Sequence, residues 1–267
     1  MNFEQNFLGK TSPSKVYAIT SGKGGVGKTF IAINLSITFA KVGMRVLLID
    51  ADLGLANVDI LTGIRVPHTI EEVINEEASI FDVLVEGPEN VTILPAASGL
   101  GSIGEMNEKG LQFKKELLKL ENAFDFIFID TGAGISANVV DFVFMAEEVI
   151  VVMTPEPTAF ADAYAMVKLV SMEKPEMKVG IIINLVKNQK EAERVFTKFN
   201  EIVKRFLDRD VRYRGGILRD KAVGEAVMRQ VPLSLYAGKS PSMQSIREVA
   251  GNFLGLKTAK KISLFSR

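Results

Sequence analysis

A glycine-rich loop near the start of the chain constrains the fold more than any other feature. Residues 22–29 read GKGGVGKT and fit the pattern GxxxxGK[ST]. The apolar run VYAIT at 16–20 precedes the loop and predicts a buried strand, and residues 27–43 predict the helix that follows it. A strand, a loop of this pattern and a helix in direct succession are typical of a phosphate-binding loop.

The chemistry of the loop follows from its residue types. Glycines let backbone N–H groups turn inward around phosphate oxygens, and the positive end of the following helix adds to the attraction. Lys28 is expected to reach the β- and γ-phosphates, and Thr29 to offer its hydroxyl to Mg²⁺. From the loop alone, the second lysine, Lys23, is either a further phosphate contact or a solvated side chain. The predicted nucleotide-binding residues here are Gly22, Lys23, Gly24, Gly25, Val26, Gly27, Lys28, Thr29 and Phe30.

Apolar runs of strand length alternate with helix-period segments along the rest of the chain. The runs lie at 45–50, 91–96, 124–130, 148–154 and 178–184, and helical periods cover 192–207 and 240–256. Near-continuous apolar strands suit a parallel sheet that is covered on both faces. We therefore predict a doubly wound α/β fold with a mostly parallel sheet and helices on both faces. Residues 15–256 form one predicted domain, flanked by appendages at 1–14 and 257–267.

The overall composition excludes several classes of protein. The 267 residues include 32 basic and 32 acidic side chains, a balance that argues against a strongly basic nucleic-acid binder. The chain has no cysteine, so disulfides, iron–sulfur clusters, cysteine zinc sites and cysteine nucleophiles are excluded. No apolar run reaches the roughly 18 residues of a spanning helix, and the N-terminus has no apolar signal core. We expect a cytoplasmic protein, with attachment to a membrane surface still open.

Carboxylates follow two of the strand-like runs. Asp50 ends RVLLID and Asp52 lies two residues on, at the carboxyl edge where ligands bind in open α/β sheets. Asp130 ends the run FDFIFID. Mg²⁺ prefers oxygen ligands and keeps several waters, so one carboxylate acting through water is enough. These patterns predict Thr29 and Asp130 as metal-site residues, although an aspartate after a strand also serves turns and helix caps.

The heptapeptide KGGVGKT at 23–29 resembles the deviant Walker A box of the MinD/ParA ATPases. In that family the early lysine reaches across a nucleotide-sandwich dimer to the phosphates held by the partner subunit. The resemblance implies that Lys23 acts in trans, that ATP and Mg²⁺ are the cofactors, and that the chain forms a homodimer with ATP. It also implies a slow, partner-stimulated ATPase with Lys23, Lys28 and Asp52 as catalytic residues.

The same resemblance assigns roles to further residues. Asp52 orients the attacking water, and Asp50 approaches the hydration shell of the magnesium ion. Gly132 belongs to a switch segment whose backbone swings toward the γ-phosphate. The other implied residues are Asn57 near the γ-phosphate, Asp162 at the dimer face near the early lysine, Asn184 as the reader of adenine, and Pro232 and Leu233 against the base. From the residues alone, Asp162 reads equally well as a surface helix acid.

Three longer stretches, at 50–63, 85–100 and 130–168, resemble one branch of this family, the FlhG proteins (also called FleN or YlxH). These proteins govern the number and placement of bacterial flagella, together with the signal-recognition-type GTPase FlhF and flagellar switch (C-ring) proteins. Residues 3–8, FEQNFL, loosely resemble the segment of that branch that stimulates FlhF. This makes 1–14 a candidate partner-binding segment, with a disordered terminus as the alternative.

The last residues, 257–267, read KTAKKISLFSR, with four basic side chains and no acid. Many relatives bind membranes through a C-terminal basic amphipathic helix, and basic charge with apolar anchors suits an anionic bilayer. The tail is therefore either a membrane-targeting segment, which would place the protein at the inner face of the cell membrane, or a disordered end.

The favoured hypothesis is an ATP-dependent switch ATPase that regulates flagellar number and placement. It would cycle between an ADP-bound monomer and an ATP-bound dimer that binds membrane and partners. A MinD-type division-site ATPase and a ParA-like DNA-partition ATPase are the alternatives. Zero net charge disfavours the last of these, so no specific nucleic acid is expected.

Overall fold

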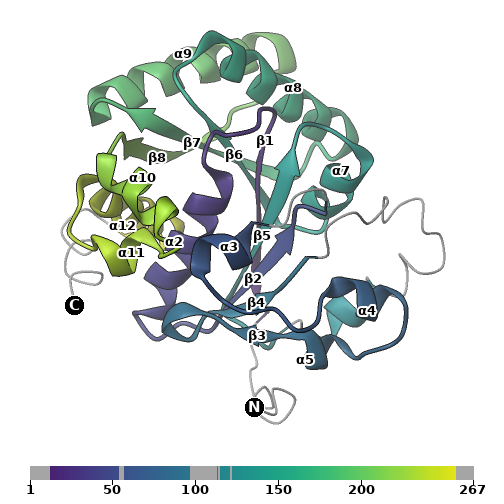
Figure 1. Cartoon of the computed structure of the whole chain (residues 1–267). Coiled ribbons are helices and arrows are strands. Elements are labelled where there is room, and N and C mark those ends of the chain that lie inside the picture. Colours follow the sequence, from purple (N-terminus) through teal and green to yellow (C-terminus); the bar gives the residue numbers. More distant parts are fainter. Residues whose placement is uncertain (1–12, 54–56, 97–112, 114, 121, 257–267) are drawn as a thin grey trace.

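The central sheet has the strand order β3-β4-β2-β5-β1-β6-β7-β8, and within the described residues only β3 runs antiparallel to its neighbour (Figure 1). The computed structural model describes residues 13–53, 57–96, 113, 115–120 and 122–256. The strands are β1 (Lys15–Ser21), β2 (Val46–Ala51), β3 (Val85–Glu86), β4 (Thr92–Leu94), β5 (Phe126–Ala133), β6 (Glu148–Met153), β7 (Lys178–Val186) and β8 (Arg212–Leu218). This arrangement confirms the predicted doubly wound, mostly parallel α/β fold.

Helices cover both faces of this sheet (Figure 1). One face carries α2 (Lys28–Ala40), α3 (Val58–Thr62), α10 (Lys221–Met228), α11 (Leu233–Tyr236) and α12 (Pro241–Phe253). The other carries α4 (Ile70–Ile74), α5 (Ile80–Val83), α7 (Ala137–Val143), α8 (Pro157–Glu173) and α9 (Gln189–Leu207). A short 3₁₀ helix, η1 (Pro88–Asn90), precedes β4.

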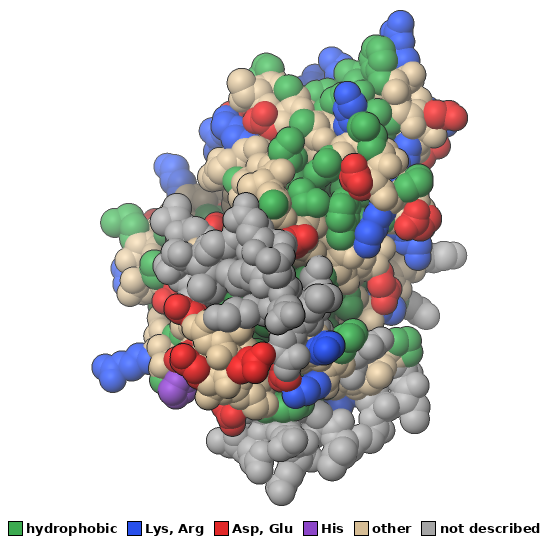
Figure 2. Space-filling view, turned by 90° about the vertical axis from the view of Figure 1, so that its right-hand side faces the viewer, with side chains coloured by type: hydrophobic (Ala, Val, Ile, Leu, Met, Phe, Trp, Pro, Cys, Tyr) green, Lys and Arg blue, Asp and Glu red, His purple; other side chains and the backbone are tan. Residues whose placement is uncertain are grey.

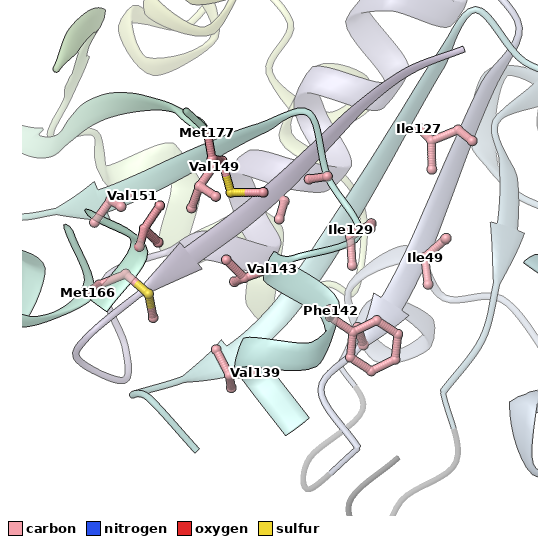
Figure 3. Close-up of a cluster of buried hydrophobic side chains, with 14 of the residues drawn as sticks. Ile49, Ile127, Ile129, Val139, Phe142, Val143, Val149, Val151, Met166 and Met177 are labelled. Carbon is pink, nitrogen blue, oxygen red and sulfur yellow. The ribbon is translucent and has the colours of Figure 1, made fainter. Parts of the chain in front are cut away.

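The strands supply two separate apolar layers because successive side chains point to opposite faces. In β2, Leu47 and Ile49 belong to one buried cluster, whereas Val46 and Leu48 belong to the other. Figure 3 shows Ile49 and neighbouring strand residues packed with side chains of α7 in the first cluster. Each fully buried aliphatic side chain contributes about 1.5–3 kcal/mol, so the strands that carry the site residues are firmly held.

One full-length strand, β8, was not predicted, because its sequence, RYRGGIL, lacks a continuous apolar run. Its two glycines are required by close packing. A Cβ on Gly215, where φ is +136°, would lie 2.8 Å from the Val249 side chain of α12. A Cβ on Gly216 would lie 2.3 Å from the Ala192 Cβ of α9. The glycines thus let helices approach both faces of β8. The need for glycine arises from contacts with residues that are distant in sequence, so the local pattern did not predict the strand.

Several predicted boundaries differ from the observed ones. The predicted helix 27–43 is helical over Lys28–Ala40 and then turns through Gly43, whose φ is +82°. The predicted strand 124–130 begins at Phe126 and continues to Ala133, so the expected switch residue Gly132 lies within β5. The segment 1–12 and the tail 257–267 lie outside the described residues. Among the helices that the structure describes, none combines the length and apolarity needed to cross a membrane.

A buried ion pair joins three strands to the end of α12. Arg214 of β8 and Glu148 of β6 are 8% and 3% exposed, and Arg214 Nε donates to Glu148 Oε1 at 2.9 Å. Gly180 of β7 lies between them, since a Cβ there would be 2.7 Å from Arg214 Cγ. Arg214 also donates to the Asn252 carbonyl at 3.1 Å and lies over the Phe253 ring. The pair therefore locates the last turn of α12 against the sheet.

We expect Glu148→Gln to lower the free energy of unfolding by about 3 kcal/mol, because it leaves a buried guanidinium without its counter-charge. Urea denaturation monitored by circular dichroism measures this loss. The matched control is Asp210→Asn, which breaks the exposed Lys204–Asp210 pair (3.2 Å) and should cost about 1 kcal/mol or less. Equal losses in the two variants would contradict a structural role for the buried pair.

Candidate functional site

The loop between β1 and α2 depends on its glycines for both conformation and packing. Gly25 and Gly27 have φ values of +74° and +94°, in the left-handed region that disfavours other residues. A Cβ on Gly27 would lie 2.5 Å from Asn184 Nδ2, and a Cβ on Gly22 would lie 2.2 Å from the Asp162 carbonyl oxygen. The loop is therefore clamped between the end of β7 and the first turns of α8, and neither contact tolerates a side chain.

Lys28 is the buried lysine of the loop, at the first residue of α2 and only 8% exposed. Burial lowers the pKa of Lys28, whereas the negative charges of Asp130 and Asp52 oppose this shift. Among the described residues, the first turn of α2 has no acidic side chain, and its N-cap residue, Gly27, makes no side-chain capping hydrogen bond. A buried ammonium at an uncapped helix N-terminus is an arrangement that binds phosphate oxygens.

Asp130 is the most deeply buried carboxylate at this edge of the sheet, 1% exposed and opposite Asp50 in the register of β5 and β2. Burial, followed by the charge of Asp50, raises the pKa of Asp130 to about 8, although a hydrogen bond from Thr29 and the charge of Lys28 lower it in part. Asp130 Oδ1 has no hydrogen-bond partner among the described residues. The site thus presents an orphaned carboxylate oxygen beside the Thr29 hydroxyl.

Both carboxylate oxygens of Asp50 accept hydrogen bonds from the backbone that follows β2. Its Oδ2 accepts hydrogen bonds from the N–H groups of Asn57 (3.2 Å) and Val58 (3.1 Å), and its Oδ1 accepts one from Asp52 (3.2 Å). Burial raises the pKa of Asp50 to about 6, against the lowering effect of these three donors. Asp50 therefore anchors the start of α3 to the sheet, in line with the turn and helix-cap alternative that the sequence left open for it.

The donor set fits Mg²⁺ held indirectly. In the part of the chain that the structure describes, no group of three or more His, Cys, Asp or Glu residues could coordinate a metal ion directly. The Thr29 hydroxyl and the unpartnered oxygen of Asp130 would hold a hydrated Mg²⁺ that keeps several waters and takes phosphate oxygens as ligands. Such an ion would also offset the buried negative charge of Asp50 and Asp130.

The predicted water-orienting residue and the predicted switch glycine lie against each other. A Cβ on Gly132 would be 3.3 Å from Asp52 Oδ1, so this carboxylate packs on the bare backbone of β5. Asp52 is half-buried, two residues beyond Asp50. Asn57 forms the N-cap position of α3, near the same edge. The structure therefore gathers Lys28, Asp52 and Gly132 with the metal-site residues, as expected from the meeting of parallel strand ends.

Lys23 behaves differently from Lys28. Its side chain is 40% exposed, and its Nζ contacts Glu156 Oε2 at 2.8 Å and Thr158 Oγ1 at 3.2 Å. Both partners lie at the start of α8, so the lysine extends away from its own loop along the rim of the site. Asp162, which was expected near Lys23, packs on the adjacent Gly22, and its role at a dimer face stays a prediction. Sequence reasoning missed Glu156, which lies in the short connection between β6 and α8 and is the N-cap residue of α8.

Asn184 supports the loop through its side-chain amide. Its Nδ2 donates to the Val26 carbonyl at 2.7 Å, and its Oδ1 accepts from the Leu185 N–H at 2.8 Å. Leu185 has a φ of +60°, a strained value for a non-glycine residue that clusters at functional sites. These two hydrogen bonds use one hydrogen of Nδ2 and one lone pair of Oδ1. The adenine-reading role predicted for Asn184 would use the second hydrogen and the second lone pair.

Pro232 and Leu233, which were predicted to lie against the base, begin α11 and meet the predicted nucleotide-binding residue Phe30 of α2. The three residues line one groove, whose free volume of about 10 Å³ is too small for a base as it stands. Asn34, missed by sequence reasoning, donates to the Phe30 carbonyl at 2.8 Å and accepts from the Ser234 N–H at 2.9 Å. This asparagine ties the two segments together across 200 residues of chain.

Comparisons with known proteins agree with this geometry. A family model described as an AAA domain matches residues 14–183. The antiactivator FleN of Pseudomonas aeruginosa is 40% identical over 226 residues, covering 84% of this chain and 80% of that protein. The flagellum site-determining protein YlxH of Helicobacter pylori is 32% identical over 250 residues, covering 92% and 84%. The septum site-determining protein MinD of Pyrococcus horikoshii, solved with Mg-ADP, is 25% identical with a TM-score of 0.74, covering 90% and 96%.

We expect Asp130→Asn to stabilise the nucleotide-free protein more as the pH rises. The pKa of Asp130 is raised from 3.8 to about 8, so the wild type gains stability from this group only at low pH and loses it as the pH rises from about 4 toward 8. The variant carries no such charge. The melting temperature of the variant minus that of the wild type, measured in EDTA, should grow by about 5 °C across this range.

Glu201→Gln is the control for this pH series, because it removes an exposed carboxylate on α9. Its melting-temperature difference from the wild type should stay nearly constant. If the melting-temperature difference between Asp130→Asn and the wild type also stays constant from pH 4 to 8, ionisation of Asp130 does not destabilise the folded protein.

Proposed function

This chain belongs to the MinD/ParA-type P-loop ATPases, and from that premise we propose that it is a switch ATPase that regulates flagellar number and placement. The supporting observation is its similarity to FleN and YlxH over more than four fifths of its length. Both relatives also match across most of their own chains. The retained phosphate loop and the buried carboxylates support ATP hydrolysis as the activity that drives the switch.

ATP would bind with its phosphates in the loop at 22–29. Lys28 and the N–H groups at the start of α2 would neutralise the β- and γ-phosphates. Mg²⁺, when bound beside Thr29 and Asp130, would supply charge neutralisation on the phosphate oxygens. Asp52 would accept a hydrogen bond from the attacking water and hold it in line with the γ-phosphate. Since the Asp52 carboxylate packs on Gly132, movement of the Gly132 backbone toward the γ-phosphate would also change the position of this carboxylate.

Dimerisation by Lys23 would couple nucleotide to partner binding. The side chain lies on the exposed rim, outside its own loop, and its counter-charge in the monomer is Glu156. Exposed pairs of this kind are weak, about 1 kcal/mol or less. Breaking the Lys23–Glu156 pair therefore costs little free energy. The charge-assisted contact that Lys23 would make with the triphosphate of a second subunit is stronger. Closing the dimer would complete each site with a cation from the other chain.

The flagellar role would involve an FlhF-type signal-recognition GTPase and flagellar switch proteins, with binding to the inner face of the cell membrane through 257–267. The N-terminal segment and this tail lie outside the described residues. A MinD-type division-site ATPase is the second candidate, because solved MinD proteins share the fold. A ParA-like DNA-partition role is the third, and zero net charge weighs against it.

We expect Lys23→Ala to bind ATP but to lose ATP-dependent dimerisation. The exposed lysine contributes little to its own site, whereas the dimer would lose two cations at the phosphates. Light scattering of the protein with a non-hydrolysable ATP analogue should show dimer dissociation constants at least about tenfold weaker, equivalent to about 1.4 kcal/mol.

Two matched variants accompany Lys23→Ala. Glu156→Gln removes the same ion pair but keeps the lysine, and it should still dimerise. Lys28→Ala should lose the nucleotide itself. Dimers of Lys23→Ala that match those of the wild type would refute the role in trans.

We expect Asp52→Ala to stop phosphate release while leaving the ATP-bound dimer intact, because the attacking water loses its orienting carboxylate. The trapped variant is then the bait for purified candidates with ATP or ADP. ATP-dependent binding of FlhF-type GTPase or C-ring proteins supports the flagellar role. Binding of division proteins or of DNA instead would favour the second or third candidate. Phosphate release at the rate of the wild type would exclude Asp52 as the orienting residue.

A further inference from the structure

An apolar pocket of about 390 Å³ opens on the face of the sheet that carries α4, α5, α7, α8 and α9. Its floor consists of apolar side chains from β1, β2 and β5, among them the register partners Ile49 and Ile129 (Figure 3). Three leucines of the segment before β5, and Met145 after α7, form its walls. We call this site the apolar pocket. Its described lining residues include none of the predicted nucleotide-site residues, so its role is separate from that of the phosphate loop.

The lining of the apolar pocket is poorly suited to hold water. Among its described lining residues only Ser14 and Glu147 have polar side chains, and Ser14 Oγ already donates to the Phe124 carbonyl at 2.7 Å. A buried water needs roughly two to four polar partners, whereas an apolar cavity of about 150 Å³ is large enough to bind benzene. The apolar pocket therefore has room for more than one apolar side chain, and filling it would add dispersion contacts along its walls.

The apolar pocket lies where the N-terminal segment joins the sheet. Pro13 and Ser14, the first two described residues, line the pocket, and β1 begins directly after them. Leu118 also lines it and is 63% exposed, so this leucine marks the open side. The exposed Glu147 is the charged residue of the described lining. Residues 1–12 therefore enter the described part of the fold at the pocket itself.

The sequence of residues 1–12, MNFEQNFLGKTS, supplies side chains that suit this site. Phe3, Phe7 and Leu8 are apolar, and Lys10 offers a cation to the Glu147 carboxylate. Phe7 lies six residues before Pro13, a connection that spans up to about 20 Å when extended. That length is enough for the chain to turn back over the open side of the apolar pocket. A short tether of this kind holds its free end at a roughly millimolar effective concentration.

We propose that the apolar pocket binds residues 1–12 of its own chain through their apolar side chains. While docked, this segment is withheld from other proteins, and a partner that uses it must first displace it. The C-terminal tail is a less suitable occupant, because it follows α12, which packs on the opposite face of the sheet. A second copy of the chain would have to compete with the high effective concentration of the tethered segment. Docking of the segment does not depend on the flagellar assignment.

The test uses the full chain, which has no tryptophan of its own. Phe7→Trp therefore introduces a single fluorophore into the segment. When the segment is docked, the indole should emit at a shorter wavelength and be quenched by acrylamide more slowly than in the urea-unfolded chain.

Two further variants in the Phe7→Trp background should release the segment. Leu118→Glu places a charge at the open side of the apolar pocket, and Leu8→Asp places one in the segment itself. We expect each to weaken docking about tenfold or more, because a carboxylate must lose its water to enter an apolar site. Acrylamide quenching should then approach that of the unfolded chain, while the far-UV circular dichroism stays unchanged.

Met172→Glu is the matched control for Leu118→Glu. Apolar side chains also reach the surface in the upper part of Figure 2. Met172, on α8, is 68% exposed and is not among the described residues that line the apolar pocket. This variant introduces the same charge at a similarly exposed position, so acrylamide quenching should change less than about twofold.

The outcomes separate docking in this pocket from other arrangements. A solvent-exposed indole in Phe7→Trp alone would overturn the proposal, and so would quenching that neither Leu118→Glu nor Leu8→Asp increases. An equal increase in Met172→Glu would show that the added charge acts nonspecifically, which also contradicts a site. Emission should stay constant on dilution by about a hundredfold, since a tethered segment docks independently of concentration; a shift on dilution would identify a second copy as the occupant instead. These measurements use neither nucleotide nor partner, so their failure would leave the proposed function unaffected.

Discussion

Two carboxylates and a lysine are buried together where β1, β2 and β5 end, and this cluster sets the requirements that the surrounding structure meets. Asp50 and Asp130 face each other in adjacent strands, and both have a raised pKa because water is excluded from them. Charge buried in this way is unfavourable unless it is hydrogen-bonded or matched by a cation. Asp50 is satisfied by three backbone donors, whereas Asp130 keeps one oxygen without a partner among the described residues. The hydrated Mg²⁺ proposed for this site would offset part of the buried negative charge.

The two lysines of the loop occupy opposite environments. Lys28 is enclosed beside Asp130, and burial lowers its pKa. Lys23 is exposed and pairs with Glu156 of α8, across 133 residues of sequence. A buried cation loses mobility and gains electrostatic strength, while an exposed one can exchange partners at little cost. In the proposed switch, the enclosed lysine would bind phosphate in its own loop, and the exposed lysine would contact the nucleotide of a second subunit.

Charge is distributed unevenly over a chain whose total is zero. The acidic side chains of α4 and α5 lie together, whereas the exposed helix α9 carries both signs. Electrostatic recognition depends on this local arrangement, because exposed charges further apart than about 8–10 Å are largely screened at physiological salt.

The sequence by itself determined the phosphate loop, most of the parallel strands, and the meeting of Asp50, Asp52 and Asp130 at one edge of the sheet. These follow from local patterns: glycine spacing, continuous apolar runs, and the rule that parallel strands end on the same side. Tertiary structure decided the rest. Strand β8 exists because Gly215 and Gly216 admit two helices, the partner of Lys23 is a residue from a distant turn, and Asp50 is occupied in anchoring α3. Each of these depends on which distant segments come into contact, and no local pattern of residues records such contacts.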